Sequence, residues 1–162
     1  MTTIIDGTAG ITFPVVAGSA SAVQASSGRV LQVVNASTVT NVSNTSNSSY
    51  VDTTLTASIT PSSSSNKILV LVSQNGVNCA SANIGNTVIL LRNGSQISTF
   101  SQFGGYGLNQ PVASISISYL DSPATTSSTT YKTQFKISTG SGQVLVQDDG
   151  CQSTITLMEI AV

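Results

Sequence analysis

Charged side chains are scarce in this sequence, and histidine and tryptophan are absent. Of the 162 residues, 7% are charged: five are Lys or Arg and six are Asp or Glu. An ordinary soluble domain is about 25% charged. Enzymes usually take their acids, bases and nucleophiles from His, paired carboxylates, Lys or an activated Cys. Because few such side chains are present, the composition predicts a structural or binding protein and not an enzyme.

The shortage of basic residues also argues against two classes of partner. The formal net charge is −1, and no basic cluster is present to neutralise nucleic-acid phosphates or an anionic membrane surface. No apolar run approaches the ~20 residues of a membrane span. The first residues, MTTIIDG, lack the basic and apolar regions of a secretory signal. We therefore expect no nucleic-acid or membrane partner and no export by the usual route.

Metal and redox motifs are lacking as well. Cys79 and Cys151 lie far apart in the sequence and match no metal or redox spacing. Two thiols are the default for a chain made in a reducing cytoplasm, although a disulfide remains an alternative. Asp148-Asp149-Gly150 could offer oxygen ligands to Ca²⁺, but it lacks the further acids of a calcium loop. We therefore expect an ordinary turn there, and no metal or cofactor.

Apolar residues make up 40% of the sequence, which is enough for one domain with a sizeable core. Such a chain has little charge to keep copies of itself apart in solution. Its composition therefore favours an obligate oligomer, whose interfaces resemble cores. The alternative is a monomer covered by Ser and Thr hydroxyls.

The first 28 residues differ from the remainder. Four apolar side chains, Ile4, Ile5, Ile11 and Phe13, are separated by glycines and followed by a proline, a pattern that argues against a helix. We interpret residues 1–28 as an extended arm that becomes stable by docking on a partner. The alternative, equally open, is a first strand and a loop of the same domain.

From residue 29 to residue 162 the pattern predicts a head built of about eight or nine strands. Asn93-Gly94, between two strand-like runs, is typical of a two-residue hairpin turn. No segment has a sustained helical period. The expected strands are Arg29–Val34, Tyr50–Thr60, Lys67–Ser73, Thr87–Arg92, Ser95–Phe100, Ser114–Tyr119, Tyr131–Ile137, Gln143–Gln147 and Ser153–Val162, and Asn35–Ser49 is expected as a polar loop or weak strand.

This pattern indicates an all-β fold, a jelly-roll-like antiparallel β-sandwich with an extended N-terminal arm. An immunoglobulin-like sandwich is the second choice. The run Ile68–Val72 is apolar at every position, so both faces of that strand should be covered. A trimer axis would cover the outer face, which makes Leu69 and Leu71 the candidate trimer contacts.

A glycine-rich stretch around residues 101–110 is expected to be a loop. Phe103 and Tyr106 are aromatic residues within it, and aromatic loop residues often contact receptors or sugars. The alternative is that both pack on their own scaffold.

Three stretches of the chain carry a resemblance to known proteins: Ile5–Pro14, then Gly28–Val34 with Leu55–Val70, and finally Asp121–Thr126 with Tyr131–Phe135 and Leu157–Ile160. They resemble small virion surface proteins of tailed bacteriophages, particularly those of cyanobacterial and marine phages. The resemblance implies a jelly-roll-like head, three-fold assembly and a place on the outside of a virion. It covers most of the chain and does not separate capsid decoration from the tip of a tail fibre.

The prediction that follows is a non-catalytic homotrimer, made in the host cytoplasm, that decorates and cements a phage capsid at the virion surface. Its arm would dock on the major capsid protein, because a short arm suits a capsid lattice better than the long shaft of a fibre. The first alternative is a tail-fibre head that contacts a host surface glycan through residues 101–110. A glycan-active enzyme is the third reading, for which Glu159 and the Asp148-Asp149 turn are the candidate acids.

Overall fold

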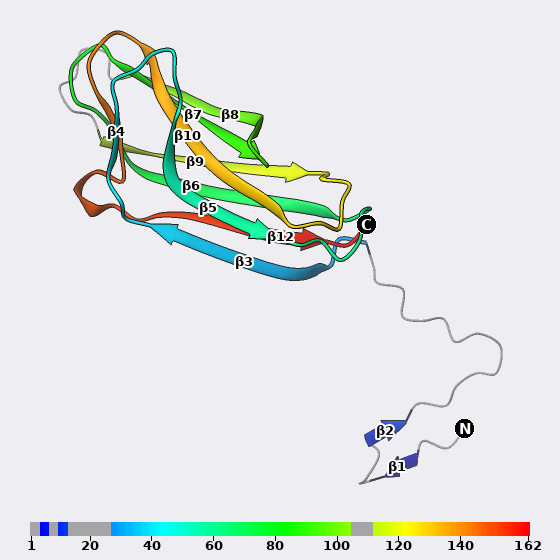
Figure 1. Cartoon of the computed structure of the whole chain (residues 1–162). Helices are drawn as coiled ribbons and strands as arrows, with labels where there is room; N and C mark the ends of the chain where they lie inside the picture. The colour runs from blue at the N-terminus through cyan, green and yellow to red at the C-terminus, as the bar shows by residue number, and fades with distance from the viewer. Residues whose placement is uncertain (1–3, 7–9, 13–26, 105–111) are drawn as a thin grey trace.

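The computed structural model describes residues 4–6, 10–12, 27–104 and 112–162, with the backbone alone for 4–6, 10–12 and 101–104. The described residues form strands and one short 3-10 turn, and Figure 1 shows the strands that follow residue 29 stacked in two layers. No helix in these residues is long and apolar enough to cross a membrane. The elements are β1 (Ile4–Asp6), β2 (Gly10–Thr12), β3 (Val30–Thr38), β4 (Val42–Asn44), β5 (Val51–Ile59), β6 (Lys67–Cys79), β7 (Gly85–Arg92), β8 (Ser95–Gly104), β9 (Val112–Asp121), β10 (Thr129–Thr139), β11 (Val144–Val146), η1 (Asp148–Gly150) and β12 (Ser153–Ile160).

The eight long strands are connected as a jelly roll. One sheet has the order β5-β10-β7-β8, and the other contains β3-β12-β6 with β9 on the far side of β6. The antiparallel pairs are nested, since β3 pairs with β12, β5 with β10, β6 with β9 and β7 with β8. This nesting of outer pairs around inner pairs defines a jelly roll. The predicted fold class is therefore confirmed, and the immunoglobulin-like alternative is not the fold observed.

Alternation along the strands builds the core between the sheets. On β10 the side chains of Tyr131, Thr133, Phe135 and Ile137 are buried, whereas the residues between them are partly exposed. The same alternation continues on the neighbouring strand β5, and on β6 and β12 of the other sheet it supplies the opposing surface. Apolar burial of this kind contributes about 25 cal/mol per Å², so the period-two pattern in the sequence is what places these strands.

The hairpin between β7 and β8 turns at Asn93 and Gly94, which have φ angles of 48° and 83°. Positive φ at both central residues is the requirement of a type I′ turn, so the prediction from the Asn-Gly pair is confirmed.

Strand β6 is longer than the sequence pattern predicts. It continues beyond Ser73 to Cys79, because the buried amide of Gln74 accepts a hydrogen bond from Thr133 and donates one to Ser153. Gly76, with φ of 60°, lets the strand pass beneath the η1 turn, where an added Cβ would lie 2.5 Å from the backbone nitrogen of Asp148. The polar stretch after β3 is likewise more ordered than expected, since β3 extends to Thr38 and β4 follows.

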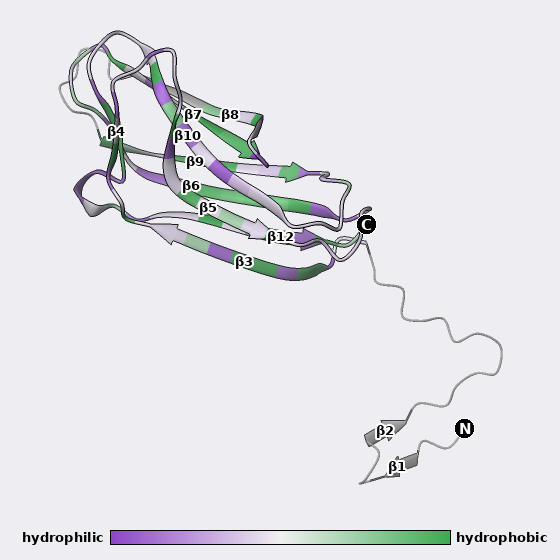
Figure 2. Cartoon of the chain, viewed as in Figure 1, coloured by the Kyte–Doolittle hydropathy of each residue, from purple (hydrophilic) through white to green (hydrophobic). Residues whose placement is uncertain are grey.

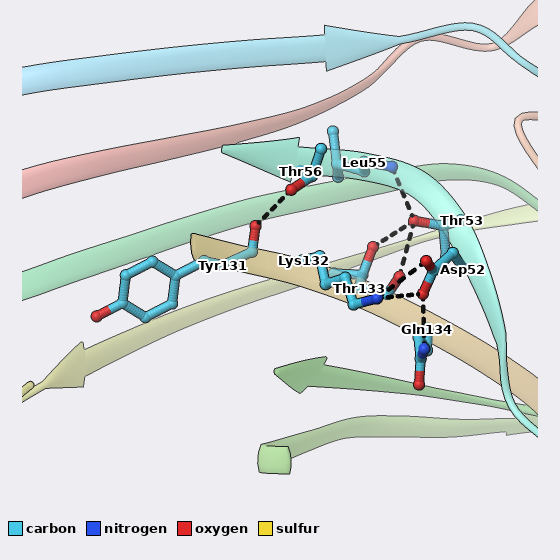
Figure 3. Close-up of polar contacts among 8 residues, drawn as sticks. All are labelled: Asp52, Thr53, Leu55, Thr56, Tyr131, Lys132, Thr133 and Gln134. Carbon is cyan, nitrogen blue, oxygen red and sulfur yellow. Dashed lines mark hydrogen bonds and ion pairs between the residues drawn. The ribbon is translucent and has the colours of Figure 1, made fainter. Parts of the chain in front are cut away.

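A bulge interrupts the pairing of β5 with β10. Residues Thr53 to Leu55 lie opposite the single residue Thr133, and Thr54 adopts a φ of 68°. The hydroxyl of Thr53 contacts both the hydroxyl and the carbonyl oxygen of Thr133 (Figure 3). The Thr54 hydroxyl lies 2.8 Å from that of Thr38 on β3. Bulges of this kind disrupt edge strands, so the β5 edge is poorly suited to pair with another chain.

Candidate functional site

The candidate site is the outer face of the sheet formed by β3, β12, β6 and β9, meaning the face turned away from the other sheet. Four apolar side chains cross this face in register, because Val33 lies opposite Met158, Met158 opposite Leu69, and Leu69 opposite Leu120. We call these four residues the apolar row. Figure 2 shows hydrophobic stretches along β3 and β6 of this sheet. Directly opposed side chains on one face lie within contact distance, so the row forms a continuous strip.

A shallow groove adjoins the apolar row. Its volume is about 380 Å³. The next register along the strands places Leu71 between Thr156 on β12 and Ser118 on β9. The small hydroxyl side chains at this level leave the space that the larger residues of the row fill. The lining residues are Leu71, Val72, Ser73, Ser116, Ile117, Ser118, Thr154 and Thr156.

The outer face carries almost no charge. In β3, β12, β6 and β9, whose side chains are all described, Lys67 is the one charged residue that the register turns to this face. The two acids next to the apolar row in sequence, Glu159 and Asp121, are both turned into the sandwich and buried. The alternation of the strands therefore removes negative charge from the face.

Glu159 is fully buried, and its carboxylate is saturated with donors. Gln32 donates to Oε2, while Asn66 and both the backbone NH and the hydroxyl of Ser62 donate to Oε1, at 2.6–2.7 Å. Burial opposes the charged form, but the hydrogen bonds from Asn66, Gln32 and Ser62 outweigh it and hold the pKa of Glu159 at about 2. This carboxylate joins β3, β12 and the β5–β6 turn.

Two further carboxylates, those of Asp121 and Asp52, also have specific structural contacts. Asp121 forms an ion pair of 2.9 Å with Arg92, and Asp52 contacts Lys132 and Gln134 on β10 (Figure 3). Both carboxylates therefore link strands of the sandwich through side-chain contacts.

The predicted calcium candidate forms a turn. Asp148 begins η1 and accepts hydrogen bonds of 2.8 Å from Asn41 and 2.5 Å from Asn78. Asp149 follows it and is exposed. Among the described residues there is no group of three or more His, Cys, Asp or Glu side chains that could hold a metal ion. Both cysteines are thiols in the structure, with Cys79 buried and Cys151 partly exposed.

The predicted contact residues fall into three groups. Leu69 and Leu71 lie on the outer face, in the apolar row and in the groove respectively. The side chain of Phe103, near the end of β8, is not described, and Tyr106 lies outside the described residues. Of the arm anchors, Ile4 lies on β1, as does Ile5, and Ile11 on β2; these have no described side chains, and Phe13 is outside the described residues.

Sequence reasoning missed the other three members of the row, Val33, Met158 and Leu120. Each lies in a predicted strand or at its end, but the pairing register that aligns them depends on which strands are neighbours. That information is not contained in the alternation of a single strand.

Comparisons with known proteins give no further guide. The sequence matches no protein-family model, and a search of curated proteins finds no match.

Proposed function

We propose that this chain is a non-catalytic structural protein of a bacteriophage virion, a homotrimer that decorates the capsid and cements the shell. The observation that supports the proposal best is the apolar row on an accessible, almost uncharged sheet face. A jelly roll that leaves such a face open is suited to assembly with other subunits. Contiguous exposed apolar surface of this kind marks interaction sites in soluble proteins.

The arm supplies the second contact in this proposal. β1 and β2 form a two-stranded antiparallel sheet of their own, with Ile5 opposite Ile11. A hairpin of two three-residue strands is marginally stable by itself in water. Docking on the major capsid protein would provide the additional surface that such a hairpin needs, and would attach the head to the shell.

Location on the particle tests the proposal. Gold-labelled antibody against the head should decorate the capsid of intact virions, and quantitative mass spectrometry should count hundreds of copies per particle. Labelling confined to the tail, with a few copies per particle, would contradict the decoration role. That result would favour the tail-fibre head, with the 101–110 segment that contains Phe103 and Tyr106 as the first region to mutate for loss of host glycan binding.

A further inference from the structure

We propose that the outer face lines a three-fold axis formed with two further copies of this chain, so that the apolar row of each copy meets the rows of the other two. The inference rests on the trimer of the proposed function and assigns its interface. It also specifies which edges of neighbouring copies touch.

The two ends of the apolar row are its most exposed members. Val33 on β3 is 56% exposed and Leu120 on β9 is 52% exposed, whereas Met158 and Leu69 between them are partly buried. β3 and β9 stand at opposite edges of this four-strand face. A closed ring requires one edge of each copy to contact the opposite edge of the next. With Val33 of one copy against Leu120 of the next, both exposed ends become buried.

The dimensions of the face suit a three-fold arrangement. Four strands spaced about 4.8 Å apart make a face about 19 Å wide, and three such faces closed into a triangle lie about 5.5 Å from the axis. Stacked sheets are about 10 Å apart, so each normally lies about 5 Å from the midplane between them. Side chains of the size of Leu and Met can therefore fill the space around the axis.

The area of the face also favours a ring over a flat pair. A face about 19 Å wide and about 25 Å long covers roughly 500 Å² in plan. A standard stable interface buries about 800 Å² per partner. Two copies packed face to face would bury the area of this face alone, which is less than a standard interface buries. A ring gives each copy two neighbours and adds contacts along the β3 and β9 edges.

The near absence of charge on the outer face allows copies of the chain to approach one another. Lys67 lies opposite Ile160 at one end of the face, beyond the apolar row, where its long side chain can reach solvent. The acids Glu159 and Asp121 are buried inside each sandwich. Three identical faces therefore meet without an unpaired charge at the contact, which would be costly to desolvate.

In the proposed trimer, the groove beside the apolar row forms a hydrated part of the interface. Its hydroxyl side chains lie one and two registers from the apolar row, and Asn35 already donates a 2.8 Å hydrogen bond to Thr156 within the same face. In the trimer the row forms a dry ring of twelve apolar side chains, because each copy contributes four. The hydroxyl levels beside it face a hydrated part of the axis, as in interfaces that combine an apolar core with a polar rim.

A charge-swap experiment tests the predicted contact between unlike edges. The variants are Val33→Glu, Leu120→Lys and the double variant that carries both. Val39→Glu is the matched control, because Val39 is 55% exposed and lies beyond the end of β3. Sedimentation equilibrium gives the mass and far-UV circular dichroism the fold. The wild type and the control should have three times the 16.5 kDa chain mass. Each single variant should be a folded monomer.

The double variant should return to the trimer, because the introduced carboxylate and ammonium meet across each of the three contacts. A wild-type mass of one or two chains would overturn the inference, as would a trimeric Val33→Glu variant. A folded double variant that remains monomeric would show that residues 33 and 120 do not meet across the contact and would also overturn it. A trimer that passes these tests but labels neither capsid nor tail would refute the proposed function while leaving this interface in place.

Discussion

The hydroxyl of Tyr131 donates a 2.6 Å hydrogen bond to Oδ2 of Asp121, and this buried contact joins the two sheets of the sandwich. Tyr131 lies on β10 of one sheet, and Asp121 ends β9 of the other. Arg92 on β7 completes the cluster with a bond of 2.9 Å to the same carboxylate. Burial of the phenol, together with the adjacent Asp121 carboxylate, raises the pKa of Tyr131 above its ordinary value. Tyr131 therefore remains a donor throughout the physiological pH range.

Replacing Tyr131 by Phe should lower the free energy of unfolding by about 1.5–3 kcal/mol, the usual contribution of a hydrogen bond to a charged group. The ring still fills the core, so the fold should be unchanged. Urea denaturation followed by circular dichroism measures the difference. Asp121→Ala should cost more, because it leaves both the phenol and Arg92 without their partner. A Tyr131→Phe variant as stable as the wild type would mean that the inter-sheet bond contributes nothing.

Glu159 should make the stability of the head depend on acid. Its pKa in the folded state is about 2, below the ordinary value of 4.5. A depressed folded-state pKa contributes stability that is fully present above the unfolded-state pKa and is lost as the pH falls through the folded-state pKa. The free energy of unfolding should therefore decrease between about pH 4.5 and pH 2.

Glu159→Gln should weaken that decrease, since the amide does not titrate, and should lower stability at pH 7, where it loses charge-assisted hydrogen bonds. Denaturation at a series of pH values compares the two proteins. Parallel pH profiles for the variant and the wild type would contradict this role of Glu159.

Two neighbouring residues on β6 should respond to the same substitution in opposite ways. Val70 is fully buried between the sheets, whereas Leu69 lies on the outer face. Val70→Asp should prevent folding, because an unpaired charge in the core is very costly. Leu69→Asp should fold and fail to assemble. Circular dichroism and sedimentation of the two variants decide the matter, and an unfolded Leu69→Asp chain would place Leu69 in the core instead.

Alternation along single strands was enough to predict the sandwich, and the Asn-Gly pair was enough to predict the hairpin turn at Asn93 and Gly94. Alternation could not predict where β6 ends, because Gln74 is polar and becomes compatible with burial only when Thr133 and Ser153 meet its amide. Of the four residues in the apolar row, Leu69 alone was predicted from the sequence as a contact residue. Leu69 stands out within an apolar run, whereas its alignment with Leu120 follows from the pairing of β6 with β9.

Reducing agent should leave the melting temperature of the head unchanged. Cys79 and Cys151 are thiols in the structure, and Cys79 is buried in the core. Differential scanning calorimetry with and without dithiothreitol measures the effect. A clear fall in melting temperature on reduction would instead reveal a disulfide, which across so long a loop would contribute several kcal/mol.

Deleting residues 1–27 should leave a folded, soluble head and abolish attachment to the particle. Two backbone hydrogen bonds hold the first residues of the head against its last residues. The Gly28 amide donates a hydrogen bond of 2.8 Å to the carbonyl of Ala161, and the Ala161 amide donates one of 2.9 Å to the carbonyl of Arg29. A cut before Gly28 retains both bonds and the whole of β3. This deletion tests the predicted boundary between an arm of residues 1–28 and a head of residues 29–162.

Circular dichroism and co-sedimentation with capsids stripped of the native protein test both halves on one truncated chain. The full-length chain is the positive control for binding, and Leu69→Asp in the full-length chain separates loss of assembly from loss of the arm. If the truncated chain aggregates, the arm contributes to the core or to the subunit contacts, and the arm boundary is wrong. If it folds and still binds, the head carries the capsid contact. In that case attachment through Ile4, Ile5, Ile11 and Phe13 must be abandoned, because the truncated chain lacks all four side chains.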